Sequence, residues 1–279
     1  MRNEEYSLLR LVPAVLRARD FRLYTKTGRL VDLWQNNGAA VLGHTPPSLL
    51  KELKNTASRG LYAPFPHFLE ARYHKALSRI FPGRAFRLYA APPPELEKLA
   101  ADGSASLWWP FADPASPLTV PENPPVLIPV LPGIQTWRGG LPLGLCVLAV
   151  KESAAIGQDG LPPGGLPPGD CLPPILLAVA VRGIYDLLSA APARANLNYP
   201  RIAKALKNSE GQNFWQRSGI YLTPRQEPSQ KEWAALFRRF LENGFLLPPH
   251  PSHPLILPGV LSPGEEAKLA ALLPAIDIF

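Results

Sequence analysis

Prolines interrupt this chain so often that few long helices or central strands can form. The sequence has 35 prolines in 279 residues, more than twice the usual share of about 5%. Proline lacks a backbone N–H and fixes φ, so it ends helices and is confined to the edges and ends of strands. The proline-rich middle, residues 91–172, therefore predicts short strands joined by loops.

One proline-rich stretch repeats a short motif. Residues 160–174 read GLPPGGLPPGDCLPP, with Leu-Pro-Pro-Gly beginning at Leu161 and again at Leu166. Two copies five residues apart predict a flexible or polyproline-type surface loop rather than a repeat architecture. An alternative interpretation is an interaction module, recognised through this LPPG loop by a partner that binds proline-rich segments.

The composition is that of a folded protein, with 46% hydrophobic and 18% charged residues. The net charge is +7, but the basic residues are scattered, which favours a solvated surface over a nucleic-acid site. The N-terminal residues are atypical of a signal peptide. Arg182 and Asp186 interrupt the apolar stretch at 173–191, so we expect no membrane span and a cytoplasmic protein.

The cysteines and histidines predict no metal site. Cys146 and Cys171 are too few for a disulfide framework and lie in apolar stretches, so we expect buried free thiols. His250 and His253 have metal-ligand spacing, but no third ligand is near them in the sequence. No Ser-His-Asp, P-loop or zinc signature is present.

Strand and helix signals alternate through the first 90 residues. Residues 29–34 read as a strand, and Thr45 is placed to cap a helix that has Pro46 at its first position. The expected apolar face of that helix consists of Leu49, Leu50, Leu53 and Ala57. A second helix, at about 67–80, precedes a strand at 84–90.

The rest of the chain predicts strands first and an α+β layer last. Strands are expected at 105–111, 125–132 and 141–150, followed by a buried helix at 173–190. A capping box at Ser229 and Glu232 starts a later helix, and Ser262, Pro263 and Glu265 start the last one. The C-terminal elements alternate as a small α+β domain would.

Two regions resemble a known family. Residues 17–54, and more loosely the C-terminal stretch 199–273 with its L-x-x-G-F-L-L-P-P step, are similar to class III aminotransferases such as glutamate-1-semialdehyde aminomutase. Together they cover less than half of the chain. The positions that match are Tyr24, Gly28, Val31, Asp32, Leu42, Gly43, His44 and Pro47. In that family the histidine is structural, and we expect His44 to satisfy backbone groups near the helix start.

The resemblance implies the fold type I of pyridoxal-phosphate (PLP) enzymes. Such an enzyme needs a lysine for the Schiff base, a turn whose N–H groups hold the phosphate, and an aspartate for the pyridine nitrogen. The phosphate turn aligns with Ala91-Pro92-Pro93-Pro94-Glu95. The carboxylate positions align with Val130 and Leu131, and the lysine position with Gln135. None of the three supplies the group that the chemistry needs.

Two further sets of residues are candidates. Lys151 is the best remaining candidate for a Schiff-base lysine, although a surface pair with Glu152 is the simpler interpretation. Trp34, Asn36 and Asn37 follow the first strand at a place that lies near the substrate entrance in the family. They could line a small-molecule cleft, or form an exposed turn with asparagine at positive φ.

We therefore expect a reduced α/β fold of the PLP-transferase type I, with a truncated large domain and a small C-terminal α+β domain. We expect an N-terminal segment at 1–85 that carries a dimer contact. The proline-rich remnant of the large domain is expected at 86–190, and the small C-terminal domain at 191–279. The expected function is binding or scaffolding by a homodimer without a cofactor, after loss of transamination. The alternative is an active PLP enzyme.

Overall fold

The computed structural model describes residues 7–133, 145–152, 166–208 and 214–274. Contacts divide the chain into two compact units. The first unit comprises residues 1–45, 111–115 and 192–279. The second comprises residues 46–110 and 116–191. Both units are discontinuous in sequence. The domains expected from the sequence, 1–85, 86–190 and 191–279, are each continuous.

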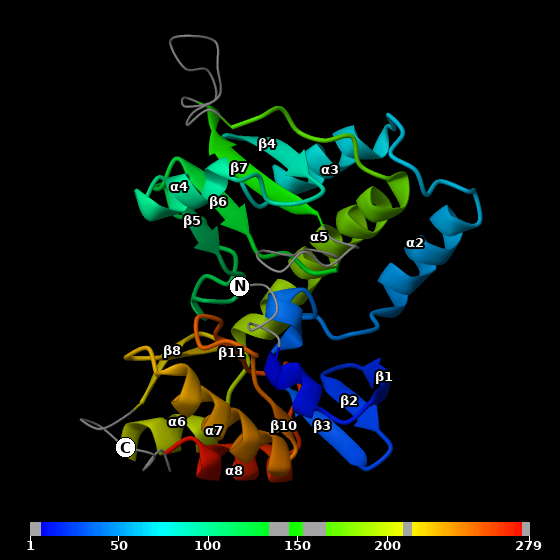
Figure 1. Cartoon of the computed structure of the whole chain (residues 1–279). Coiled ribbons are helices and arrows are strands. Elements are labelled where there is room, and N and C mark those ends of the chain that lie inside the picture. Colours follow the sequence, from blue (N-terminus) through cyan, green and yellow to red (C-terminus); the bar gives the residue numbers. More distant parts are fainter. Residues whose placement is uncertain (1–6, 134–144, 153–165, 209–213, 275–279) are drawn as a thin grey trace. The chain divides into compact units, whose positions relative to one another are not determined.

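The second unit is built on a four-stranded sheet of order β4-β7-β6-β5 (Figure 1). Its strands are β4 Arg84–Tyr89, β5 Ala105–Trp108, β6 Val126–Pro129 and β7 Cys146–Lys151. Strands β4, β5 and β6 fall within stretches that the sequence predicted as strands, and β7 extends one residue beyond its predicted stretch. Strand β7 runs antiparallel to β4 and β6, and β5 is parallel to β6. Strands β4, β5 and β6 therefore run in one direction.

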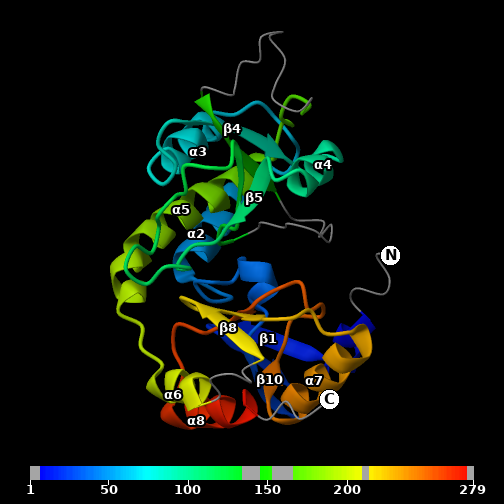
Figure 2. The same cartoon turned by 90° about the vertical axis from the view of Figure 1, so that its left-hand side faces the viewer.

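Helices cover both faces of this sheet. The helices of the unit are α2 Pro47–Ala57, α3 Leu69–Leu77, α4 Glu95–Ala101 and α5 Pro174–Ala195, whose last residues continue into the first unit. Figure 2 shows α4 on one side of the sheet and α3 and α5 on the other. Leu96 and Leu99 of α4 join the core with Val126, Ile128 and Leu148. Successive strand residues point to opposite faces of a sheet, so alternate residues such as Val126 and Ile128 face α4.

The first unit joins the two ends of the chain. A meander of β1 Val15–Arg19, β2 Arg22–Thr25 and β3 Gly28–Asp32 is extended by β10 Phe245–Leu246, which pairs in parallel with β3. A second sheet has the order β11-β9-β8, from β8 Trp215–Ser218, β9 Tyr221–Pro224 and β11 Leu255–Ile256. Two 3-10 helices, η1 Ser7–Leu11 and η2 Gln35–Gly38, complete the N-terminal part.

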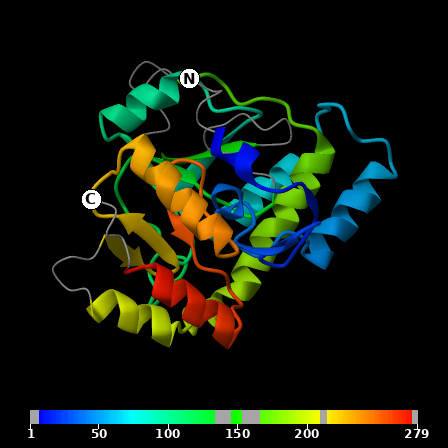
Figure 3. The same ribbon diagram turned by 60° about the horizontal axis from the view of Figure 1, so that its bottom comes forward.

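Three helices gather on one side of this unit (Figure 3). They are α6 Pro200–Asn208, α7 Gln230–Glu242 and α8 Pro263–Leu272. The predicted capping boxes are confirmed, because Ser229 caps α7 and Ser262 caps α8, each with a glutamate three residues later. The buried face of α7 includes Trp233, Phe237 and Phe240. The mixed α/β class predicted from the sequence is therefore confirmed.

The start of α2 differs from its prediction. Proline 47 lies in the first turn, but Pro46 is the N-cap and no side chain caps the helix, so Thr45 has no capping role. Of the expected apolar face, Leu49 is buried, whereas Leu50 and Leu53 are 42% and 40% exposed. The described part of the chain therefore leaves two of the four expected apolar residues exposed.

Helix α5 bears on the expected absence of a membrane span, which stays a prediction. Arg182 and Asp186 form an i,i+4 ion pair of 2.6 Å within it, and they do not prevent the 22-residue helix from reaching the length and mean hydropathy, 1.5, of a membrane-crossing helix. Buried core helices also have these properties, and 44% of the apolar window is buried inside the protein. Gly183 lets α5 approach closely, since a Cβ there would lie 2.8 Å from the carbonyl oxygen of Pro132.

Candidate functional site

The carboxyl ends of β4, β5 and β6 meet at one edge of the sheet in the second unit. Ligands of open α/β sheets bind outside the carboxyl ends of the strands. The segment that aligns with the phosphate turn follows β4 directly, and Val130 and Leu131 follow β6. We call this place the carboxyl edge, and it is the part of the second unit where a cofactor site would be expected.

The turn after β4 has few donors for an anion. Pro92, Pro93 and Pro94 have no N–H, and α4 begins immediately after them at Glu95. The N–H of Ala90 already donates to Oδ2 of Asp170, with 2.8 Å between the two atoms. A phosphate at this turn would have to displace that carboxylate or lie beside it.

The second LPPG copy holds Asp170 in place. Leu166 is only 2% exposed and belongs to the core around α4. Arg87 Nη1 donates to the carbonyl oxygens of Leu166 and Pro167, both at 3.0 Å, and the Tyr89 hydroxyl donates to Pro167 at 2.7 Å. This copy is thus part of the fold, which corrects the prediction of a plain surface loop. The first copy, at Leu161, lies outside the described residues.

The other strand ends at the carboxyl edge are apolar. Val130 and Leu131 are 6% and 1% exposed and carry no carboxylate. Trp108, the last residue of β5, donates from Nε1 to the carbonyl of Thr119 at 2.8 Å. Gln135, at the aligned lysine position, lies outside the described residues. The described ends of β5 and β6 therefore offer packing surface and no ionisable group.

Every lysine of the chain lies in the described ranges, so their surroundings can be compared. Only Lys151 is half-buried. The exposed lysines are Lys26, Lys51, Lys54, Lys75, Lys98, Lys204, Lys207, Lys231 and Lys268. A Schiff-base lysine needs an enclosed site that sets its reactivity, and this leaves Lys151 as the one lysine to consider.

Lys151 lies at the opposite end of the sheet from the proline turn. It pairs with Arg84, the first residue of β4, whereas Tyr89, the last residue, adjoins the turn. Five strand steps separate the two ends, which is about 17 Å at the usual rise. The Lys151 Nζ donates to Asn123 Oδ1 at 3.2 Å rather than pairing with Glu152. Lys151 and the proline turn therefore do not belong to the same site.

The cavity beside Lys151 is dominated by Arg84. The cavity has a volume of about 460 Å³ and is lined by Pro82, Gly83, Arg84, Val120, Pro121, Glu122 and Lys151. Arg84 is 6% exposed, and its two Nη atoms donate to five backbone carbonyls, four of them in residues 121–125. Burial lowers the pKa of Arg84. Both Nη atoms already donate to the backbone, so Arg84 fixes the loop rather than serving a ligand.

The turn at Trp34, Asn36 and Asn37, in the first unit, is held by its own contacts. Asn36 and Asn37 have φ of 49° and 55°, as expected for asparagine at positive φ, and Trp34 donates from Nε1 to Asn37 Oδ1 at 2.7 Å. Gln35 is also left-handed and fully buried, which the sequence did not indicate. Of the three expected residues, Trp34 and Asn37 are joined by a side-chain hydrogen bond, and Asn36 lies between them in the same turn.

His44 has a different role from the expected one. Its Nε2 lies 2.7 Å from Oδ2 of Asp32, a carboxylate only 1% exposed. Asp32 Oδ1 accepts the N–H groups of Trp34 and Gln35 at 2.8 and 2.9 Å. His44 thus orients a buried carboxylate that holds the turn, whereas we expected it to satisfy backbone groups.

The cysteines and paired histidines give mixed outcomes. Cys146 is buried, as predicted, and burial raises the pKa of its thiol to about 12, so the thiol stays neutral. Cys171 is exposed, which contradicts the prediction. His250 bonds to Ser252 at 2.8 Å. Across the described residues, no group of three or more potential metal ligands is found.

Comparison with known proteins identifies the fold. No family model matches the chain. An uncharacterized protein of Treponema pallidum (strain Nichols) is 28% identical over 288 residues, covering 92% of this chain and 93% of that protein. The ornithine δ-aminotransferase of Plasmodium falciparum covers 95% of this chain and 92% of its own, with a TM-score of 0.64 and 11% identity.

Two further solved structures agree. An omega-transaminase from Sphaerobacter thermophilus has a TM-score of 0.60 and 12% identity, covering 95% of this chain and 90% of its own. The acetylornithine aminotransferase of Elizabethkingia anophelis has a TM-score of 0.61 and 13% identity, covering 96% and 94%. At such identities the likeness establishes architecture alone: this chain has the α/β fold of PLP-dependent aminotransferases.

Proposed function

We propose that this chain uses an aminotransferase-like fold for binding or scaffolding and no longer catalyses PLP-dependent transamination. The observation that carries the proposal is the bond between Ala90 and Asp170. Backbone N–H groups at a strand–helix turn are what holds a phosphate. Here three prolines remove such donors, and a carboxylate of the same chain takes the N–H of Ala90. The residues at this turn do not fit the phosphate of PLP.

The position of the lysines supports the same proposal. The half-buried Lys151 is about 17 Å along β4 from the proline turn, and its Nζ is bonded to Asn123. One pyridine ring with its phosphate ester is much shorter than that separation. The alternative of an active PLP enzyme therefore requires both a different phosphate site and a different orientation of Lys151.

Spectroscopy of the purified chain tests this proposal. We expect that incubation with PLP, followed by gel filtration, leaves no visible absorbance of an internal aldimine. Borohydride reduction should then add no pyridoxyl mass to Lys151. A stable yellow protein whose colour is lost in Lys151→Arg, but kept in the exposed-site control Lys98→Arg, would establish the alternative. An authentic ornithine aminotransferase serves as the positive control.

We further propose that the chain acts as a homodimer. Five large apolar side chains of α2 and the connection to α3 are 40–61% exposed, namely Leu50, Leu53, Tyr62, Phe65 and Phe68. We call this set the α2 patch. Figure 1 shows α2 and the connection to α3 along the outside of the second unit. Clusters of exposed apolar residues mark interaction surfaces, and a second copy offers the same apolar surface in return.

A further inference from the structure

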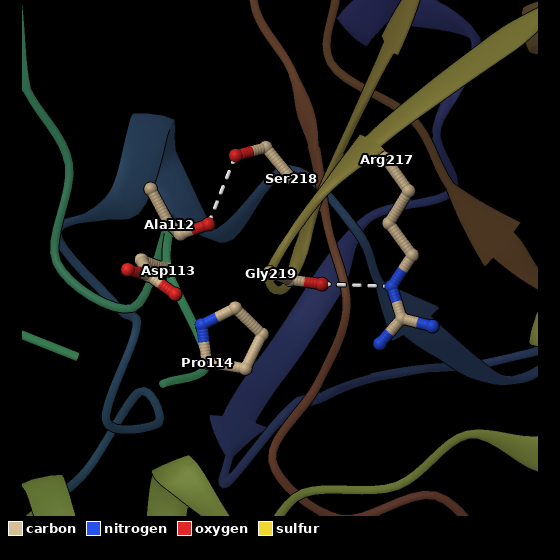
Figure 4. Close-up of a pocket in the computed structure, with 6 residues that line it drawn as sticks. All are labelled: Ala112, Asp113, Pro114, Arg217, Ser218 and Gly219. Carbon is tan, nitrogen blue, oxygen red and sulfur yellow. Dashed lines mark hydrogen bonds between the residues drawn. The ribbon is translucent and has the colours of Figure 1, made fainter. Parts of the chain in front are cut away.

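A hollow in the first unit lies between the β8–β9 turn and the segment 111–115. Its volume is about 520 Å³, and it is lined by Ala112, Asp113, Pro114, Arg217, Ser218 and Gly219 (Figure 4). That volume lies within the range of small-molecule sites. All six residues belong to the same compact unit, so the hollow does not depend on the placement of the second unit.

The guanidinium of Arg217 is held in one orientation. Its Nε donates to the carbonyl oxygen of Gly219 at 2.8 Å, and its Cζ lies 5.3 Å from the centre of the Tyr199 ring. The ring covers the guanidinium, and the Gly219 bond uses one of its five donors. The fork formed by Nη1 and Nη2 has no hydrogen-bond partner among the described residues. A fixed fork of this kind matches the two oxygens of a carboxylate or phosphate.

The charge of Arg217 is not compensated within the described chain. No carboxylate lies within ion-pair distance of its nitrogens among the residues that the structure covers, and burial lowers the pKa of the guanidinium. Half-buried arginines are ordinarily paired, since partial removal from water costs free energy that a partner recovers. An anionic ligand would supply that partner.

The two walls of the hollow are in close contact. Gly219 has φ of 57°, and a Cβ there would lie 1.9 Å from the carbonyl oxygen of Phe111, a buried residue that itself has φ of 65°. Ser218 Oγ donates to the carbonyl of Ala112 at 2.9 Å and joins the two walls. Positive φ is costly at the non-glycine residue Phe111, whereas glycine adopts it readily, and strained backbone of this kind tends to occur at binding sites.

We propose that this hollow binds the oxyanion end of a small molecule, a carboxylate or a phosphate, on the Nη fork of Arg217. The other charged group of the lining is Asp113, on the far side of Gly219 from the guanidinium (Figure 4). Its Oδ1 accepts the N–H of Ala115 at 2.9 Å. Asp113 would repel a second negative charge, so the hollow favours a ligand with one anionic end. The proposal is independent of whether the chain binds PLP.

Binding to the full-length chain is the test, with glycerol 3-phosphate and acetate as probes at constant ionic strength. We expect calorimetry to show saturable binding of at least one probe. The probe that binds more tightly shows whether the site prefers a phosphate or a carboxylate. Arg217→Gln should weaken that binding about tenfold or more, the loss of a charge-assisted bidentate contact. The control Arg238→Gln removes the same charge from an exposed residue of α7 and should leave binding unchanged.

Two further measurements keep the test decisive if Arg217→Gln does not fold. Asp113→Asn, which keeps Arg217, should tighten binding because it removes a like charge. In the unmodified protein, the bound probe should slow phenylglyoxal modification of Arg217 but not of Arg238. Absence of saturable binding by both probes, or equal weakening in the Arg217 and Arg238 variants, would overturn the proposal.

Discussion

The main-chain N–H of Ala90 donates a 2.8 Å hydrogen bond to the carboxylate of Asp170, a residue 80 positions further along the chain. In return, the N–H of Asp170 donates to the carbonyl of Leu88, also at 2.8 Å. The pair binds the second LPPG copy to the end of β4. The carboxylate of Asp170 thus takes the N–H group that immediately precedes the proline turn.

The first prediction concerns this pair. Asp170→Ala should lower the free energy of unfolding by about 0.5–1.5 kcal/mol, because the hydrogen bond from the backbone N–H of Ala90 is lost at an exposed site where water can replace the acceptor. Asp170→Asn keeps an oxygen acceptor and should lose less. Urea unfolding measures the change, and hydrogen exchange at Ala90 should accelerate in Asp170→Ala. The control Glu97→Gln removes a carboxylate from the exposed side of α4. Unaltered exchange at Ala90 would show that the bond does not form in solution.

A second prediction concerns Arg84, whose two Nη atoms donate to five backbone carbonyls. Arg84→Lys keeps the charge but cannot reach several carbonyls with a planar fork, and it should lower the free energy of unfolding by about 2–4 kcal/mol through unsatisfied buried groups. The control Arg59→Lys changes an exposed arginine of the same unit and should be neutral within about 0.5 kcal/mol. Equal stability of the two variants would mean that the hydrogen bonds of Arg84 contribute nothing measurable to the free energy of unfolding.

The sequence predicted local structure better than it predicted contacts between distant segments. Capping boxes at Ser229 and Ser262 depend on residues three positions apart, so a pattern could identify them. The Ala90–Asp170 bond joins residues far apart in the chain, and nothing in the LPPG motif indicated that Leu166 of its second copy would be buried. Arg217 was one of many scattered basic residues, and only the fold places it at a hollow where no carboxylate of the described residues pairs with it.

For the leucines of α2, the sequence predicted an apolar face that the single chain leaves partly exposed. Helical spacing placed Leu49, Leu50 and Leu53 on one apolar face, and spacing cannot tell whether a face is buried within the chain or against a partner. The left-handed turn at Trp34 to Asn37 was indicated by its asparagines, whereas the burial of Gln35 depends on the carbonyl of Ile256, to which its Nε2 donates at 2.9 Å. Contacts of this kind come from tertiary structure.

A third prediction uses the contact between Gly219 and Phe111. Gly219→Ala should lower the free energy of unfolding by more than about 2 kcal/mol, because a Cβ would overlap the Phe111 carbonyl in addition to the cost of positive φ. Gly244 is the matched control, since it has φ of 83° but its Cβ would lie 3.8 Å from the nearest atom. Gly244→Ala should cost only about 1 kcal/mol. Thermal or urea unfolding that ranks the two variants equally would contradict the contact.

A fourth prediction concerns pH and Glu265. Burial alone would raise the pKa of Glu265, but hydrogen bonds from Arg22 and Ser262 outweigh it and lower the pKa from 4.5 to about 2. The Arg22 Nε and Glu265 Oε1 atoms are 3.0 Å apart. A carboxyl group whose pKa is lower in the folded state adds stability above its unfolded pKa. That contribution is lost as the pH falls from about 4.5 towards 2.

The measurement is the melting temperature as a function of pH. Glu265→Gln should be less stable than the unmodified chain at pH 6, and the difference should shrink through the acid window. Glutamine can still accept the N–H of Ser262 and close the capping box. It has one acceptor oxygen, so the variant loses the charge together with one of the two hydrogen bonds from Arg22. Glu242→Gln, at an exposed position of α7, should follow the unmodified chain. A Glu265→Gln difference that persists undiminished at pH 2 would point to a cause other than the carboxylate.

The last prediction addresses the α2 patch. If a second copy covers Leu53 and Phe65, glutamate at both positions would bury two charges against apolar side chains, and no partner charge exists on an identical surface. Light scattering should therefore give a dimer for the unmodified chain and a monomer for Leu53→Glu with Phe65→Glu. Circular dichroism should show unchanged helix content, because both positions are solvent-exposed in the single chain. Val260→Glu, at a 63% exposed valine outside the patch, should remain dimeric. A monomeric unmodified chain would remove the dimer proposal and leave the α2 patch to a different partner.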